Sequence, residues 1–287
     1  MRTITSKDGT SIAFEQTGKG SALILVVGAF NDRTTGIPLA ETLKQSFTVY
    51  NYDRRGRGDS GDTLPYAIER EIEDLDALID EAGGSAYVFG YSSGAVLAMK
   101  AVAKGSAIRK LALYEPPLVV EPSEAAPENQ TRARLSTSGG LASEISNRRT
   151  LLKDDLAGEL AALIAAGKRG EAVELFQTKG VGIPAEVVVG MRNAPFRPML
   201  EKMAHTLVYE MTILGNGALP PELVAAITIP MLVMVGSQSP SFMHDSAKVM
   251  TADSAQGEYR NLEGQNHDIV PAVVAPVLET FLGRTSE

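Results

Sequence analysis

The chain has 287 residues, of which 44% are hydrophobic and 22% charged, so it can bury the core of an ordinary globular protein. Its formal net charge of −8 argues against nucleic acid or an anionic membrane as the main partner. The absence of cysteine excludes disulfides and cysteine catalysis, and the three histidines (His205, His244 and His267) are too scattered to predict a metal site.

The N-terminal residues lack the apolar core of a signal peptide. No apolar run reaches the ~18 residues that a transmembrane helix needs. Together these features predict a cytoplasmic protein.

The first part of the chain alternates between strand and helix patterns. Two short alternating segments on either side of Asp8-Gly9 predict a β-hairpin, and the continuous apolar run at 22–27 predicts a strand buried on both faces. Further strands are expected at 47–52, 86–89 and 110–114, and helices at 38–45, 67–82 and 95–102. Strands that alternate with helices predict a mostly parallel sheet with helices on both faces.

This alternation stops after residue 117. Helix patterns at 156–166, 171–178 and 199–214, entered through a charged linker at 121–129, predict a mainly helical insertion. Strands at 230–235 and 258–262 and helices at 243–250 and 271–282 then resume the first pattern. We therefore expect an α/β core of residues 1–117 and 229–287 with a helical cap at 118–228.

The segment Gly90-Tyr91-Ser92-Ser93-Gly94 lies between a strand pattern and a helix pattern. A serine on such a sharp turn is exposed at the carboxyl end of the sheet, beside the N-terminus of the following helix. The pattern therefore predicts that Ser92 is a nucleophile. A plain Gly/Ser turn is the structural alternative.

His267 is the candidate base, because a serine hydroxyl needs a neighbouring base to become nucleophilic. It lies in a polar loop between the last strand and the last helix, at the expected carboxyl edge of the sheet. His205 and His244 fall within predicted helices, so we expect structural roles for them.

Three motifs together resemble the α/β-hydrolase family over residues 1–117 and 229–287. They are the serine turn at 90–94, the loop Asp53-Arg54-Arg55-Gly56-Arg57-Gly58, and the segment 262–267 that ends at the histidine. The resemblance implies the α/β-hydrolase fold, with a mostly parallel central sheet, helices on both faces and an inserted helical cap. It also implies that the backbone N–H groups of Ala29 and Ser93 form an oxyanion hole. The chain has Val27-Gly28 where family members often have His-Gly, but both donors are backbone groups and do not need that histidine.

The catalytic acid departs from the usual family pattern. Most members place an aspartate shortly after the strand at 230–235, where this chain has Ser239. Glu115, at the end of the strand at 110–114, occupies the place where a minority of the family keeps its acid. We therefore expect a Ser92–His267–Glu115 triad. Asp245 is the alternative acid, and a capping role at the exit to the insertion is the alternative for Glu115.

The resemblance implies a cofactor-independent serine hydrolase that cleaves a carboxylic ester or lactone. The serine turn and the Glu115-Pro116-Pro117 segment are similar to those of capped lactonases that open zearalenone-type macrolactones. The absence of the usual aspartate and of the His-Gly pair leaves two alternatives. One is a non-hydrolytic ligand-binding protein on the same fold, and the other is a lyase or cyclase of secondary metabolism.

A methionine-rich set in the insertion predicts an apolar small-molecule substrate. Four of its members recur at four-residue spacing and are expected on one helical face: Met199, Met203, Leu207 and Met211. Packing of the cap on the core is the structural alternative. The candidate substrate contacts are Phe30, Tyr91, Met199 and Met203. No cofactor, metal, nucleic acid or membrane partner is expected, and a homodimer is compatible with the sequence.

Overall fold

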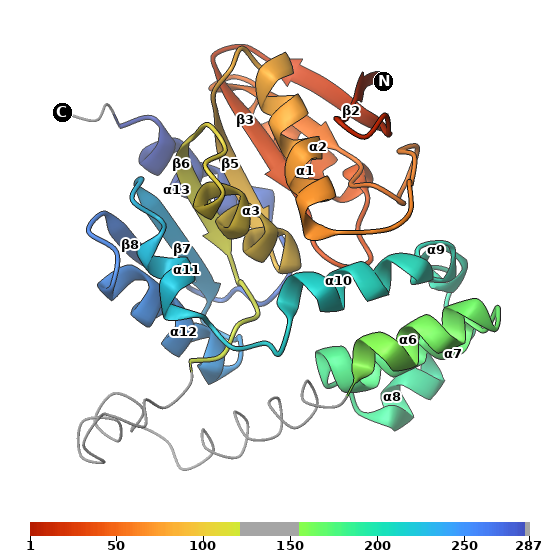
Figure 1. The fold of residues 1–287 in the computed structure, drawn as a ribbon. Coiled ribbons are helices and arrows are strands. Elements are labelled where there is room, and N and C mark those ends of the chain that lie inside the picture. The colour runs from red at the N-terminus through yellow and green to blue at the C-terminus, as the bar shows by residue number, and fades with distance from the viewer. Residues whose placement is uncertain (121–154, 285–287) are drawn as a thin grey trace. The chain divides into compact units, whose positions relative to one another are not determined.

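The computed structural model describes residues 1–120 and 155–284 (Figure 1). The chain divides into two compact units, Met1–Pro117 with Pro220–Glu287, and Leu118–Leu219, which are described separately below. The linker predicted at 121–129 lies outside the described residues.

The first unit contains an eight-stranded sheet with the order β1-β2-β4-β3-β5-β6-β7-β8. β1 and β2 form the predicted antiparallel hairpin, and β2 also pairs antiparallel with β4, whereas all other neighbours are parallel. The strands are β1 (Arg2–Thr5), β2 (Ser11–Gly18), β3 (Ser21–Val26), β4 (Phe47–Tyr52), β5 (Ala86–Tyr91), β6 (Ile108–Tyr114), β7 (Met231–Gly236) and β8 (Gly257–Leu262). This confirms the predicted, mostly parallel α/β sheet.

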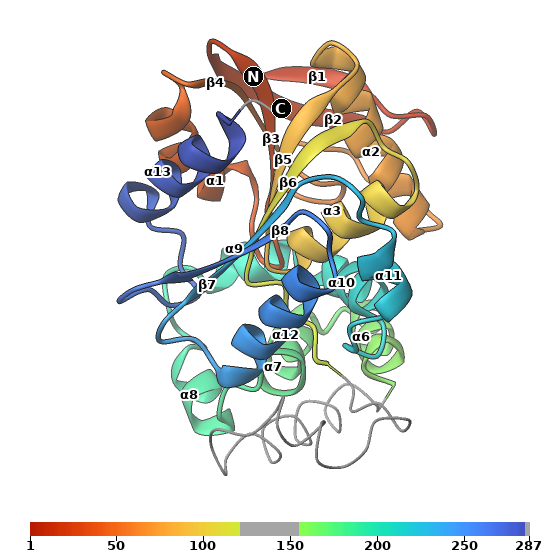
Figure 2. The ribbon, with the colours of Figure 1, turned by 90° about the vertical axis from the view of Figure 1, so that its left-hand side faces the viewer.

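Helices cover both faces of this sheet. α1 (Arg33–Leu43) and α13 (Pro271–Leu282) lie on one face, and α2 (Ile68–Glu81) and α3 (Ser93–Ala103) lie on the other (Figure 2). Two more helices, α11 (Pro221–Ala225) and α12 (Ser241–Ala252), follow the return of the chain to this unit. Buried apolar side chains of α1 and α13 pack against one face of the sheet, and α2 and α3, on the other face, also bury apolar side chains. Both faces of the sheet are therefore covered, as its apolar strands predict.

Helix α1 begins five residues before the predicted start. The Asp32 carboxylate accepts a hydrogen bond from the Thr34 N–H at 2.9 Å and caps the helix N-terminus. The polar residues from Arg33 to Thr35 therefore join the helix, although they carry no apolar periodicity.

The second unit is helical in its described part. Its elements are α6 (Leu156–Ala165), α7 (Arg169–Leu175), the π-helical turn η1 (Phe176–Val181), α8 (Ala185–Gly190), α9 (Arg197–Lys202), the 3₁₀ turn η2 (Ala204–Thr206) and α10 (Leu207–Leu214). The single helix predicted at 199–214 is wrong, because the chain breaks between α9 and α10. At the break, both the N–H and the hydroxyl of Thr206 donate to the Met203 carbonyl, at 2.9 and 2.8 Å. These local bonds replace the regular helical ladder.

The break also overturns the single helical face predicted for the methionine-rich set. Met199 is 44% exposed, whereas Met203 is 3% exposed, so the two side chains do not share one environment. The four-residue spacing in the sequence was therefore compatible with two short helices as well as with one long helix.

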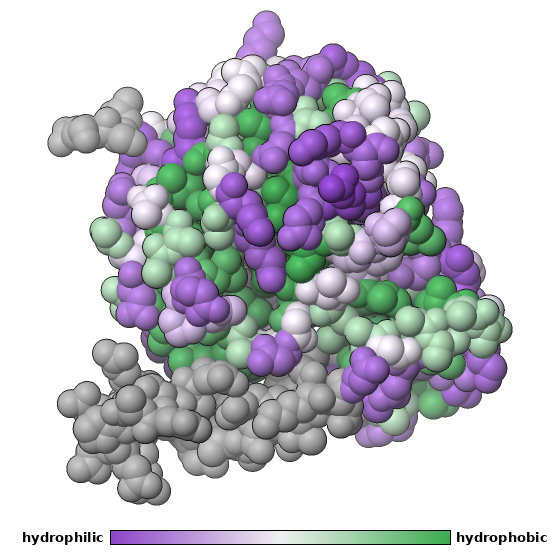
Figure 3. All heavy atoms as spheres, viewed as in Figure 1, coloured by the Kyte–Doolittle hydropathy of each residue, from purple (hydrophilic) through white to green (hydrophobic). Residues whose placement is uncertain are grey.

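Polar side chains are interspersed with apolar ones on the face shown in Figure 3. Among residues 1–120 and 155–284, no helix combines the length and the apolar character that a bilayer-crossing segment requires.

Candidate active site

Ser92 lies on a strained turn between β5 and α3. Its backbone has φ +55° and ψ −126°, a conformation that non-glycine residues rarely adopt. A Cβ at Gly94 would lie 2.3 Å from the Val26 carbonyl oxygen, and one at Gly90 would lie 2.6 Å from the Ala95 Cα. The two glycines therefore allow strand, turn and helix to pack closely around the serine.

His267 lies within hydrogen-bond reach of Ser92 and Glu115. Its Nε2 is 3.2 Å from the Ser92 Oγ, and its Nδ1 is 2.5 Å from the Glu115 Oε2. Because a carboxylate only accepts hydrogen bonds, Nδ1 carries a proton and Nε2 can accept one from Ser92. The structure thus brings the three residues of the expected triad together, although they are far apart in the sequence.

Two tyrosines at the ends of neighbouring strands fix the histidine loop. The Tyr91 hydroxyl donates to the His267 carbonyl at 2.8 Å, and its ring centroid lies 5.0 Å from the imidazole. The Tyr114 hydroxyl donates to the Asn266 carbonyl at 2.5 Å. Tyr91 is also a predicted substrate contact, and its hydroxyl is engaged with this loop. Sequence reasoning gave Tyr114 no role, since nothing in the sequence pairs it with Asn266.

Glu115 is buried and follows directly after β6. Its backbone has φ +51°, another left-handed conformation at a non-glycine residue. Burial raises the pKa of the carboxyl group, but hydrogen bonds from His267, Ser239 and the Gly236 N–H outweigh burial. The net pKa lies below its ordinary value, so Glu115 is an anion at neutral pH.

Ser239, at the position where most family members have an aspartate, contacts the Glu115 carboxylate. Its hydroxyl donates to the Glu115 Oε1 at 2.5 Å, and the Gly236 N–H donates to the same oxygen at 2.8 Å. One carboxylate oxygen therefore accepts from the loop after β7, and the other faces His267. The only sequence feature that pointed to a role for Ser239 was its position, where most family members have the catalytic aspartate.

Asp245, the alternative acid, lies in α12 and makes no hydrogen bond to His267 in the described part of the chain. Its Oδ2 is buried without a hydrogen-bond partner among the described residues. Burial raises the pKa of its carboxyl group. The geometry around His267 therefore favours Glu115 over Asp245.

The loop after β3 passes directly beside the nucleophile. A Cβ at Gly28 would lie 2.8 Å from the Ser92 Cβ, so glycine permits this close approach. Phe30 has φ +59°, and the Asn31 side chain donates to the Ala29 carbonyl at 2.6 Å. Within residues 1–120 and 155–284, the Ala29 N–H donates to no protein acceptor. This N–H is therefore available to a ligand.

The other predicted contacts are distributed over both units. Phe30 is half-buried beside Ala29, and Ser93 is the first residue of α3. Met199 and Met203 belong to the second unit. Among the described residues, no group of three or more His, Asp or Glu side chains is arranged to bind a metal ion.

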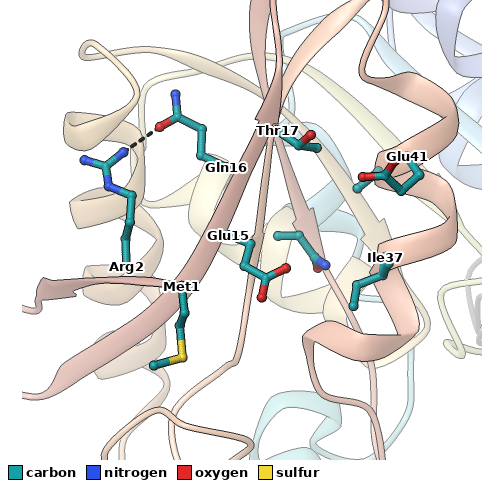
Figure 4. Close-up of a pocket in the computed structure, with 9 residues that line it drawn as sticks. Met1, Arg2, Glu15, Gln16, Thr17, Ile37 and Glu41 are labelled. Atoms are coloured by element: carbon teal, nitrogen blue, oxygen red, sulfur yellow. Dashed lines mark hydrogen bonds between the residues drawn. The ribbon is translucent and has the colours of Figure 1, made fainter.

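A separate hollow lies beside β2 and α1 (Figure 4). It is lined by Met1, Arg2, Glu15, Gln16, Thr17, Ile37, Ala40, Glu41 and Asn51. The Arg2 guanidinium donates to Gln16 and pairs with Glu81. The hollow contains none of the residues around Ser92.

A mostly parallel sheet that carries a serine on the sharp turn after a central strand, with a histidine in reach, defines the α/β-hydrolase class. A profile of the Alpha/beta hydrolase family matches residues 23–276, and the chain therefore belongs to this family of hydrolases. An α/β hydrolase of known structure from Sphaerobacter thermophilus DSM 20745 is 44% identical, with a TM-score of 0.82. That match covers 98% of this chain and 100% of the other.

Similarity to proteins of named activity is more limited. The N-formylmaleamate deformylase of Pseudomonas putida is 38% identical over 105 residues, which are 35% of this chain and 39% of that protein. The chain thus spans less than two fifths of the length of the curated relatives that it matches. The enol-lactonase of Burkholderia xenovorans LB400 is 18% identical with a TM-score of 0.61, over 99% of this chain and 100% of that one. It shares the fold.

Proposed function

We propose that the protein is a cofactor-independent serine hydrolase that cleaves a carboxylic ester or lactone of an apolar small molecule. The main support is the imidazole of His267, which lies 3.2 Å from the Ser92 Oγ and 2.5 Å from the buried Glu115 carboxylate. A base between a serine hydroxyl and a carboxylate is the arrangement that activates serine for acyl transfer.

In the proposed reaction, the Ser92 Oγ attacks the carbonyl carbon while the His267 Nε2 accepts its proton. The Ala29 and Ser93 N–H groups stabilise the oxyanion, and Glu115 stabilises the imidazolium. The tetrahedral intermediate then collapses with cleavage of the bond to the leaving oxygen, which His267 protonates. The acyl group remains as an ester on Ser92. Water activated by His267 hydrolyses this acyl-enzyme and releases the acid.

The substrate class rests on weaker support. Phe196 and Met199 in the second unit are 45% and 44% exposed, which favours contacts with an apolar ligand. In the proposed enzyme, the second unit, Leu118–Leu219, acts as the cap. The partial identity to an N-formylmaleamate deformylase supports an N-formyl amide as a second candidate substrate class.

The first test is covalent labelling with a fluorophosphonate probe, followed by intact mass and peptide mapping. Wild type and the control Ser237→Ala are expected to gain one adduct at Ser92, and Ser92→Ala is expected to gain none. Ser237 is a suitable control because its hydroxyl accepts from the Gly264 N–H in a neighbouring turn. A folded wild type without an adduct would contradict the serine hydrolase and favour the ligand-binding, lyase or cyclase alternatives.

Hydrolysis of p-nitrophenyl esters, lactones and N-formyl amides by wild type then identifies the substrate class. Ser92→Ala is the control for each compound. Activity that survives this substitution would assign the hydrolysis to another residue or to a contaminant.

Ser239→Ala is expected to lower kcat by about tenfold, because a hydrogen bond to a charged group contributes about 1.5–3 kcal/mol. Its hydroxyl donates to the Glu115 carboxylate, so its loss leaves the acid less well oriented. KM should change little, since Ser239 acts through Glu115 and not on substrate. Steady-state kinetics with p-nitrophenyl acetate measures the effect, with Ser237→Ala as the control. Equal activities of the two variants would contradict this role.

A further inference from the structure

Three buried arginines follow β4, in the loop that resembles a family motif. Arg54 and Arg55 are fully buried and Arg57 is 1% exposed. Arg54 forms a two-pronged ion pair with Glu71 on α2, and Arg55 forms another with Asp74. These carboxylates compensate the buried charges of Arg54 and Arg55. The catalytic steps proposed above use none of the three arginines.

Two of the arginines also contact the loop beside Ser92. The Arg57 Nη1 donates to the Gly28 carbonyl at 3.1 Å, and the Arg54 Nη1 donates to the Val27 carbonyl at 3.1 Å. The Asn31 side chain donates to the next carbonyl, that of Ala29. Three successive carbonyls of this loop are therefore fixed by side chains.

The Gly28 carbonyl and the Ala29 N–H belong to one peptide group. Among the described residues the only cis peptide bond is Leu64–Pro65, so this peptide is trans and its C=O and N–H point in opposite directions. A guanidinium on the carbonyl side thus fixes the direction of the N–H. It also polarises the peptide and makes the N–H a stronger donor, an effect that is larger in a buried site.

We infer that Arg57 is a positioning residue of the oxyanion hole, which orients and polarises the Gly28–Ala29 peptide for the developing oxyanion. This inference rests on the proposed function. A cation on the carbonyl side also stabilises negative charge on the N–H side through the aligned peptide dipole. Because Gly28 lies against Ser92, the peptide is close enough to the nucleophile for this effect to reach the reacting carbonyl.

Arg55 provides a matched control. It is equally buried in the same loop and is bound by Asp74, Asp8 and the Arg70 carbonyl. Within residues 1–120 and 155–284, Arg55 makes no hydrogen bond to the loop after β3. A purely structural role of the arginines predicts similar losses for Arg55→Met and Arg57→Met, whereas the positioning role predicts a catalytic loss for Arg57→Met alone.

The experiment compares Arg57→Met, Arg57→Lys and Arg55→Met with wild type in three readouts. These are the rate of fluorophosphonate labelling of Ser92, kcat and KM with p-nitrophenyl acetate, and Ki for an aryl trifluoromethyl ketone. The ketone is informative because it binds serine as a tetrahedral oxyanion. Removal of a whole oxyanion donor costs about 10²–10³ in kcat, so Arg57→Met should lower kcat and labelling about 10- to 100-fold. Its Ki should rise by a similar factor, with KM within about twofold.

Arg57→Lys should retain part of the rate, because it keeps the charge without the planar guanidinium. Arg55→Met should keep all three readouts near wild type even where its stability falls. If circular dichroism shows that Arg57→Met does not fold, Arg57→Lys takes its place, with an expected fall in the labelling rate and a rise in Ki. Folded Arg57 variants with wild-type labelling and Ki would overturn the inference alone. Wild type that is not labelled at all would overturn the proposed function and this inference with it.

Discussion

Glu115→Gln is expected to lower kcat by about 10³- to 10⁴-fold, the scale of an acid-to-amide change in a serine triad. The geometry around the carboxylate gives the reason. Oε1 accepts hydrogen bonds from two donors, the Gly236 N–H and the Ser239 hydroxyl. A glutamine must therefore place its carbonyl oxygen at this position, which leaves its NH₂ group facing the His267 Nδ1.

An amide N–H at that position selects the wrong imidazole tautomer. It donates to Nδ1, so the ring proton moves to Nε2, the nitrogen 3.2 Å from the Ser92 Oγ. Nε2 can then no longer accept the serine proton. The variant thus loses both the base and the charge that stabilises the imidazolium, while its packing changes little because the side chains have the same shape.

Steady-state kinetics with p-nitrophenyl acetate and the fluorophosphonate labelling rate measure this loss. Asp245→Asn is the matched control, since Asp245 makes no hydrogen bond to His267 among the described residues. Its kcat should stay within about threefold of wild type, as expected for a substitution outside the reacting groups. A large loss in Asp245→Asn with normal activity of Glu115→Gln would contradict the assignment of the acid.

Ser92, His267 and Glu115 could be found in the sequence because parallel strands end at one edge of the sheet. Each of the three follows a predicted strand, so the topology alone brings them to the same edge. The choice of Glu115 as the candidate acid required one more observation, the serine at position 239 where most family members have an aspartate. The strand pattern predicts which residues follow the carboxyl ends of strands, and the parallel order of the strands places these residues at one edge of the sheet.

The contacts between loops could not be predicted in this way. Nothing in the sequence pairs Ser239 with Glu115, or Arg57 with the Gly28 carbonyl, because these bonds depend on how separate turns are directed in space. The break after Met203 was missed for a different reason. The spacing of apolar residues carries no information about the Thr206 hydroxyl, which donates to the Met203 carbonyl and interrupts the helix.

Glu71→Gln is expected to lower the free energy of unfolding by about 3–5 kcal/mol, the cost of breaking a buried ion pair by removing one partner. Glu71 is 1% exposed and accepts two hydrogen bonds from the fully buried Arg54, at 2.7 and 2.8 Å. Without the carboxylate, a buried guanidinium loses its counter-charge but cannot lose its proton. Glu69 lies on the same helix, but its side chain is 58% exposed. Glu69→Gln should therefore change the free energy of unfolding by less than about 1 kcal/mol, much less than Glu71→Gln.

The same carboxylate makes stability depend on pH. Burial raises the pKa of Glu71, but the charges of Arg54 and Arg57 and the hydrogen bonds from Arg54 and Tyr66 outweigh it, so the net pKa lies below its ordinary value of 4.5. The unfolded chain then binds the proton more readily than the folded chain. The contribution of Glu71 is fully present above pH 4.5 and is lost as the pH falls through the lowered folded pKa.

Urea unfolding at pH 7 and at intervals down to pH 3 measures both effects. The free energy of unfolding of wild type should fall over this acidic range, and that of Glu71→Gln should fall less, because its amide does not titrate. Arg54→Met/Glu71→Leu should be more stable than Glu71→Gln, since an apolar pair leaves no isolated buried charge at these two positions. A double variant less stable than Glu71→Gln would mean that the Arg54 bond to the Val27 carbonyl contributes more to stability than its pairing with Glu71.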